Sequence, residues 1–375
     1  MGQKVTILAP SVPHYRCAFF FGLREYLLKR NVDLQLIHGV EENIQCATNG
    51  EFSPPWAKRV DHLSVKVGGL ELCWQPYLRC IRDSDLVIVQ QANRLLLNYM
   101  LIAKRAFSRQ KLAFWGHGAD LQRHPKDLRN RWKRVFANRV DWWFAYTEEV
   151  KAGLVKGSFP AERITNVQNS IDTEPLLRMK AEVSVSQLEG LRREMGLGRG
   201  PIGIYCGRIY SEKRIDFLFD ACRMVRDREP SFELIVIGAG PEEKKVALAS
   251  REMPWIHYVG ARLNHERVPY FLLADMCLMP GLVGLVIIDC FALEVPLITT
   301  RFPFHSPEIG YLRNNENGVI TVDTMESYVA GLCHVLSDRA FLAKLKAGCR
   351  EARATYTMGA MVESFGKGVI ACLGT

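Results

Sequence analysis

Two positively charged side chains stand on one short loop in the second half of the chain. Arg208 and Lys213 lie in Gly-Arg-Ile-Tyr-Ser-Glu-Lys, which begins at Gly207, directly after an apolar run at 202–206 that predicts a strand. Arginine offers a forked set of donors and lysine a mobile point charge, which together suit a pyrophosphate. A surface loop is the simpler interpretation of this segment alone. A second candidate segment later in the chain favours a binding site.

A second candidate segment runs from Pro280 to Asp289. Its glycines allow a ligand to approach the backbone, and the amides at 283–286, where a helix is predicted to start, can hold phosphate oxygens. Asp289 can accept hydrogen bonds from two sugar hydroxyls. A buried helix with a stray acid is the alternative, but an acid in an apolar run is costly without a partner. The candidate residues are Gly281, Leu282, Val283, Gly284, Leu285 and Asp289.

Both segments follow short apolar runs in a chain where such runs alternate with longer amphipathic stretches. This alternation predicts an α/β fold with parallel sheets flanked by helices. The predicted strands are 5–8, 34–38, 86–90, 112–115, 142–146, 202–206, 233–237, 256–259, 276–279 and 296–299. Ligands bind beyond the carboxyl ends of such strands, and both candidate segments stand there.

The length of 375 residues exceeds the ~250 to 300 at which a single core stops growing, so two domains are expected. The alternation of predicted strands and helices begins again at 202, after a stretch that is predicted to be rich in helix and that ends in a glycine-rich run. The predicted parts are a first Rossmann-like domain at 1–170, a linker at 171–200, a second Rossmann-like domain at 201–355 and a C-terminal helix at 356–375.

The two candidate loops together resemble the retaining glycosyltransferases of family 4, in the glycogen synthase-like superfamily with the GT-B fold. In that family a Gly-Arg-x-x-x-x-Lys loop holds the diphosphate, which matches Arg208 and Lys213. Two glutamates eight positions apart contact the transferred sugar and the ribose. Here Gly281 stands at the first and Asp289 at the second. The resemblance implies that Asp289 holds the ribose, and it leaves the transferred sugar open.

Further segments extend the resemblance over most of the chain. They are Asn169-Ser-Ile-Asp172, the Gly238-Ala-Gly-Pro241 loop and the nucleobase-edge loop Tyr258 to Arg262. The resemblance implies that Gly238 and Arg262 contact the nucleotide. It also implies two sheets that face a cleft, an acceptor-binding first domain, a nucleotide-sugar-binding second domain and a last helix that crosses back to the first.

Four more residues are candidates because they follow predicted strands. His117, between two glycines, corresponds to a histidine that faces donor sugar and acceptor in the family, and near neutral pH it can exchange hydrogen bonds with a hydroxyl. Arg16 follows the first strand, where it can neutralise phosphate or hold the acceptor. His305 and Glu308 follow the strand at 297–300 and are predicted to face the donor's sugar or base.

No metal and no other cofactor are expected beside the nucleotide sugar. Asp83-Ser-Asp85 has the form of a metal motif, but it precedes a predicted strand and is interpreted as a turn. His117 and His124 lack partners at metal-ligand spacing, and Gly238-Ala-Gly240 lacks the third glycine of a dinucleotide fingerprint.

Positive charge concentrates between Lys104 and Arg139, where eleven Lys or Arg face two acids and several aromatic residues. Such a segment suits an anionic membrane surface or a lipid phosphate, while a solvated helix face is the plain alternative. No recognition motif for nucleic acid accompanies the charge. Eleven cysteines without Cys-x-x-Cys pairing favour a reducing cytoplasm. The basic segment adds the inner face of the membrane as a predicted peripheral location.

The resulting hypothesis is a metal-independent, retaining hexosyltransferase. It would use a nucleotide diphosphate sugar, with UDP favoured and GDP open, and a glycan or polyprenyl-linked acceptor in cell-surface polysaccharide or lipopolysaccharide synthesis. The alternatives are a nucleotide-sugar epimerase of the same fold, a binding protein without catalysis and, more remotely, a nucleic-acid binder.

Overall fold

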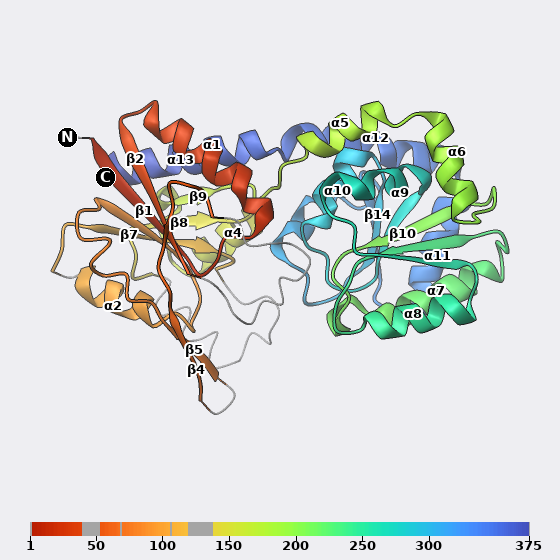
Figure 1. Cartoon of the computed structure of the whole chain (residues 1–375), viewed down its shortest axis with the longest axis horizontal. Helices are drawn as coiled ribbons and strands as arrows, with labels where there is room; N and C mark the ends of the chain where they lie inside the picture. Colours follow the sequence, from red (N-terminus) through yellow and green to blue (C-terminus); the bar gives the residue numbers. More distant parts are fainter. Residues whose placement is uncertain (1, 40–52, 68–69, 106, 119–137, 375) are drawn as a thin grey trace. The chain divides into compact units, whose positions relative to one another are not determined.

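The computed structural model describes residues 2–39, 53–67, 70–105, 107–118 and 138–374 (Figure 1). The chain forms two compact units. Unit 1 contains Met1–Asp172 and Met358–Thr375, and unit 2 contains Thr173–Thr357. Each unit has a parallel sheet with helices around it. The predicted α/β class with two parallel sheets is therefore confirmed.

Unit 1 is built on a seven-strand parallel sheet, counted over the described residues. Across the sheet the strands are β3 (Lys58–Arg59), β2 (Val32–His38), β1 (Gln3–Ala9), β6 (Leu86–Gln90), β7 (Lys111–Gly116), β8 (Trp142–Ala145) and β9 (Ile164–Asn166). A separate antiparallel pair, β4 (Leu63–Val67) and β5 (Leu70–Trp74), was not predicted. The strands β3 and β9 were also missed, because two or three residues carry no readable alternation.

Helices cover both faces of this sheet. The helices α1 (Cys17–Leu28) and α13 (Met358–Gly374) pack side by side over one core, where Phe365 stacks on Phe144 with ring centroids 4.1 Å apart (Figure 1). The other core includes side chains of α2 (Leu96–Arg105) and α4 (Glu148–Lys156). The last helix of the chain thus completes the core of unit 1.

Unit 2 is built on a six-strand parallel sheet, again counted over the described residues. Across it lie β12 (Ile256–Gly260), β11 (Glu233–Ile237), β10 (Ile202–Cys206), β13 (Met276–Met279), β14 (Leu297–Thr300) and β15 (Gly318–Thr321). Because all of them run parallel, the loops that follow β10, β11, β12, β13 and β14 emerge at one edge.

The helices of unit 2 pack on this sheet and on one another, with α7 against α11 and α10 against α12. They are α5 (Glu174–Glu182), α6 (Val185–Glu194), α7 (Ile215–Arg226), α8 (Glu243–Glu252), α9 (Val268–Leu273), α10 (Val286–Leu293), α11 (Met325–Ser337) and α12 (Arg339–Thr355). The short 3-10 turns η3 (Ser211–Lys213), η4 (Asn264–Arg267) and η5 (Pro307–Tyr311) lie in strand-end loops. None of the helices in the described part of the chain has the length and apolarity needed to cross a membrane.

Candidate functional site

Lys213 is a buried cation at the carboxyl edge of the unit 2 sheet. It ends η3, is 6% exposed, and its Nζ donates to the carbonyl of Leu282 at 2.5 Å. Burial lowers the pKa of its amine to about 8. In the described part of the chain no carboxylate lies within ion-pair distance of this amine. A buried amine that contacts a neutral carbonyl and the Tyr210 ring, 5.6 Å from its centroid, is suited to receive an anion.

Gly281 lies against the backbone that carries Lys213. The amide of Leu282 donates to the carbonyl of Glu212 at 2.9 Å. A Cβ atom on Gly281 would stand 2.2 Å from that carbonyl oxygen and 2.7 Å from the carbonyl carbon of Lys213. The close approach of the two loops therefore requires glycine here, and it leaves no room for a carboxylate at the position where the resemblance expects one.

Gly281→Ala is expected to lower the free energy of unfolding by ~1–3 kcal/mol, because the new methyl group must push two backbone segments apart. Gly284→Ala is the matched control, since a Cβ there would meet only the Ser306 Oγ, at 3.7 Å. Urea unfolding of both variants measures the difference. Equal midpoints would contradict this packing argument.

His305 fixes the loop after β13. Its Nδ1 accepts from the Val283 amide at 3.0 Å, and its Nε2 donates to the Thr300 carbonyl at 2.9 Å. Burial lowers the pKa of this imidazole, which keeps the ring neutral, as these two bonds require. Both ring nitrogens thus hold backbone groups in this structure. Glu308 comes shortly after His305 in the sequence. It lies in η5 and is also buried.

The Val283 amide is consequently committed to His305. The amides of Gly284 and Leu285, just before α10, donate no hydrogen bond within the described residues. Both residues are partly exposed. Of the predicted phosphate-binding amides, these two are the ones left open to a ligand.

Asp289 lies inside α10 and is 3% exposed. Its Oδ1 accepts from Nη2 of Arg267 at 2.8 Å. Burial raises the pKa of this carboxyl, and the charge of Arg267 opposes the rise. The Nε of Arg267 is also buried, with no acceptor in the described part of the chain. Sequence reasoning missed Arg267, and the only signal for it was that a buried acid needs a partner.

Glycines join the loops after β10, β11 and β12. A Cβ on Gly238 would stand 1.9 Å from the carbonyl oxygen of Gly207, and the φ of Gly238, 149°, also disfavours a side chain. The Gly238 amide donates to Gly260, and the Ile209 amide donates to Ala239, both at 2.9 Å. The three strand ends are therefore tied together, which positions the loop of Arg208.

The arginines of these loops differ in what they contact. Arg208 is exposed, and its guanidinium has no hydrogen-bond or ion-pair partner among the residues that the structure describes. Arg214, next to Lys213, is ion-paired with Asp323. Arg262 donates through Nε to the Tyr270 hydroxyl at 3.4 Å. Arg208 is thus an exposed cation of the loop that is available to a ligand.

In unit 1 the structure brings Arg16 and His117 to one aromatic side chain. The guanidinium carbon of Arg16 lies 5.8 Å from the ring centroid of Tyr146, and the ring of His117 lies 4.6 Å from the same centroid. Arg16 is buried and donates to Asn169 Oδ1 at 2.6 Å. His117 is exposed, at the carboxyl end of β7. Arg16 therefore has a buried structural contact near the carboxyl edge of the unit 1 sheet, while His117 is exposed at that edge.

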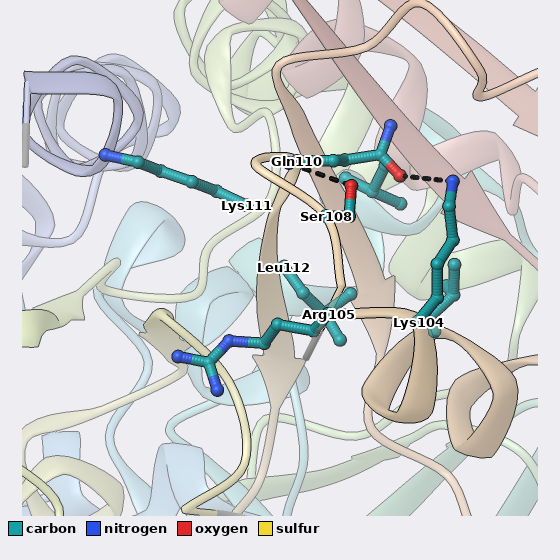
Figure 2. A pocket seen from close by; sticks show the side chains of 8 residues that line it. Lys104, Arg105, Ser108, Gln110, Lys111 and Leu112 are labelled. Atoms are coloured by element: carbon teal, nitrogen blue, oxygen red, sulfur yellow. Dashed lines mark hydrogen bonds between the residues drawn. The ribbon is translucent and has the colours of Figure 1, made fainter.

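The described part of the basic segment lies near the opposite, amino end of β7. Figure 2 shows a small hollow there, lined by Lys104, Arg105 and Lys111 among others. Lys104 contacts Gln110 at 3.2 Å, Arg105 contacts Asp141 at 2.9 Å, and Lys111 donates to the Cys372 carbonyl at 2.6 Å. These cations thus make internal contacts, and most of the segment, at 119–137, lies outside the described residues.

The motif at 83–85 lies in a turn before β6, where Asp85 Oδ2 accepts from the Lys4 amide at 2.7 Å. Over the described ranges of the chain, no three His, Cys, Asp or Glu side chains are grouped so that they could hold a metal ion. His124 lies outside those ranges.

Comparison with known proteins matches residues 200–338 to the family model described as glycosyl transferases group 1. That range contains the loops of Arg208, Lys213 and Asp289. A curated relative, the alpha-D-kanosaminyltransferase of Streptomyces kanamyceticus, is 24% identical over 149 residues. The match spans 38% of this chain and 38% of that enzyme.

Solved structures resemble the whole chain. HepE from Anabaena, crystallised with UDP, has a TM-score of 0.71 at 13% identity, with 98% of this chain and 100% of that chain covered. The pneumococcal O-GlcNAc transferase GtfA, crystallised with UDP and GlcNAc, has a TM-score of 0.69 at 12% identity, with 100% of both chains covered. The fold is therefore GT-B, as expected.

Proposed function

We propose that this protein is a retaining glycosyltransferase that transfers a hexosyl group from a nucleotide diphosphate sugar to a hydroxyl, without a metal ion. The main observation in its support is the pairing of buried Lys213 with exposed Arg208 on one loop of a group 1 glycosyltransferase domain. UDP is the favoured nucleotide, since HepE and GtfA were both crystallised with it.

In this proposal unit 2 stabilises the leaving diphosphate. Arg208 and Lys213 supply positive charge, and the Gly284 and Leu285 amides supply neutral donors at the start of α10. Asp289, held by Arg267, accepts from the ribose hydroxyls. His117 of unit 1 exchanges a hydrogen bond with the reacting sugar or the acceptor. Retention of the anomeric configuration and the role of His117 rest on the family resemblance.

The pH dependence of activity should follow Lys213. Its pKa of about 8 means that the free enzyme carries this charge below about pH 8 and loses it above. We therefore expect kcat/KM for the nucleotide sugar to fall as the pH rises through this value. Lys213→Arg, whose guanidinium stays protonated, should show a flat profile over the same range. The same fall in both proteins would exclude Lys213 as its cause.

The acceptor is proposed to be a glycan or a polyprenyl-linked sugar, in cell-surface polysaccharide or lipopolysaccharide synthesis. A peripheral site on the inner membrane face is proposed from the positive charge of the chain, +9 in total. Liposome flotation with and without anionic lipid separates this location from a wholly cytoplasmic one. Indifference of the protein to lipid charge would contradict the peripheral location.

A panel of nucleotide sugars, scored for nucleotide release in EDTA with and without a glycan acceptor, tests the activity. A transferase releases nucleotide from one donor, faster with acceptor, and chelation leaves the rate unchanged. Release of free UDP that needs no acceptor would favour an epimerase of the same fold. UDP binding without turnover of any donor would favour a binding protein.

A further inference from the structure

The loop after β14 begins with an arginine that the proposed function does not use. Arg301 is exposed, and its guanidinium has no hydrogen-bond, ion-pair or ring partner among the residues that the structure describes. Arg214, at the same edge of the sheet, is ion-paired with Asp323, and its guanidinium carbon lies 4.2 Å from the ring centroid of Phe217. Arg301 is therefore a cation that is available to a ligand at this edge.

The backbone of Arg301 is held close to the candidate diphosphate site. Its amide donates to the Thr321 carbonyl at 2.9 Å, which ties the ends of β14 and β15 together. The preceding residue, Thr300, donates through Oγ1 to the Pro280 carbonyl at 2.9 Å. Pro280 begins the loop between β13 and α10, which supplies the open amides of the diphosphate site. Arg301 is therefore one residue away from a direct contact with that loop.

The order of the strands places Arg301 on the sugar side of the diphosphate site. Across the sheet the order is β12, β11, β10, β13, β14 and β15. Arg267, the partner of the proposed ribose ligand Asp289, follows β12. Arg208 and Lys213 follow β10. Because the diphosphate of a nucleotide sugar joins the ribose to the sugar, a donor that lies along this edge brings its sugar toward β14 and Arg301.

The charge at the sugar end indicates the class of sugar. In the proposed function Arg208 and Lys213 neutralise the diphosphate, so Arg301 is a further cation beyond these two. Gly281 leaves no room for the carboxylate that the resemblance expects against the sugar. The sugar end of unit 2 thus lacks an expected negative charge and carries an exposed positive one. A guanidinium is best matched by a carboxylate, which it can bind through two parallel hydrogen bonds.

We propose that the donor is a nucleotide hexuronate, in which C6 of the sugar is a carboxylate, and that Arg301 binds this carboxylate. The inference rests on the proposed function, because the positions of ribose and diphosphate are taken from it. It names the class of sugar that the resemblance leaves open. A neutral hexose would offer Arg301 only hydroxyl groups, which bind a guanidinium less strongly than a carboxylate does.

Calorimetric titration of the full chain in EDTA with UDP, UDP-glucose, UDP-galactose, UDP-glucuronate and UDP-galacturonate tests the inference. Each uronate differs from its hexose only at C6. Wild type should bind one uronate about tenfold more tightly than the matching hexose, as expected for one charge-assisted contact. Arg301→Ala should remove this preference and bind UDP as wild type does. Arg301→Glu should bind the hexose more tightly than the uronate, because like charges repel.

Arg199→Ala is the matched control. This exposed arginine precedes β10 at the opposite edge of the same sheet, so its removal should keep the wild-type preference. Affinity for UDP and thermal melts show whether each variant is folded. Equal or tighter binding of the neutral hexoses by wild type would overturn the inference, and so would a uronate preference that survives in Arg301→Ala. Equal losses of affinity for UDP and for the uronate in Arg301→Ala would place Arg301 at the diphosphate instead.

Nucleotide release in the presence of a glycan acceptor separates this inference from the proposed transfer. Transfer from a neutral hexose donor alone would support the proposed function and contradict the inference. Binding of a uronate that depends on Arg301, in a protein that transfers no sugar, would support the inference and contradict the transfer. Absence of binding for all five nucleotides would contradict both.

Discussion

Replacing Lys213 by alanine is expected to reduce turnover ~100- to 1,000-fold, the usual effect of removing one preorganised donor from a charged transition state. The amine is buried against the Leu282 carbonyl, where water cannot easily replace it, so its charge acts at low dielectric. The effect should appear in kcat as well as in kcat/KM, because negative charge on the leaving diphosphate grows during the reaction. Initial rates of nucleotide release at saturating donor measure it.

Two further variants give this prediction its controls. Lys213→Met keeps the apolar stem and should lose activity while it unfolds near the wild-type temperature. Lys244→Ala removes an exposed lysine in α8 and should leave turnover unchanged. Wild-type turnover in Lys213→Met would remove Lys213 from the diphosphate site.

Replacing Arg267 by alanine is expected to lower the free energy of unfolding by ~3–5 kcal/mol, because it leaves the Asp289 carboxylate buried without its partner. Without Arg267 the pKa of Asp289 should rise further, so the loss should be smaller in acid, where the carboxyl is protonated. Urea unfolding of wild type and variant at acidic and neutral pH measures both effects. A destabilisation that does not depend on pH would contradict the ion-pair explanation.

The double variant Arg267→Met, Asp289→Leu separates stability from binding. Apolar side chains in place of a buried pair usually restore stability, so this protein should unfold close to wild type. Its affinity for UDP should nevertheless stay reduced if Asp289 holds the ribose. Wild-type affinity in a stable double variant would mean that the pair serves the fold alone.

The predictable part of the fold was the part with a regular pattern. The apolar runs at 86–90, 202–206, 233–237 and 276–279 became β6, β10, β11 and β13 with the same bounds. The edge strand β15 was missed because it has only four residues and begins with Gly318, which together with Asn317 belongs to a turn signal. The antiparallel pair β4 and β5 was missed because its exposed residues Leu63 and Val65 suggest no buried face.

The candidate site could be predicted from the sequence only in part. The residue types and their order located the loops of Arg208, Lys213 and Asp289, because glycines and strand ends can be read locally. The partner of Asp289 lies 22 positions away in another loop, and no local pattern connects the two. The reason for glycine at 281 is likewise spatial, since the Glu212 carbonyl occupies the place of a side chain. The Asp289–Arg267 ion pair and the glycine at 281 both result from packing between loops, and a local sequence pattern does not show such packing.

Calorimetric titration of UDP into the full chain in EDTA, for wild type and for Arg208→Ala, is the most direct test of the diphosphate site. Arg208 is exposed, so its removal should leave the fold intact and change only the charge offered to the ligand. The account predicts that wild type binds UDP without metal and that Arg208→Ala binds about tenfold or more weakly, as expected for one charge-assisted contact. Equal affinity of both proteins, or no binding of UDP to wild type, would contradict it.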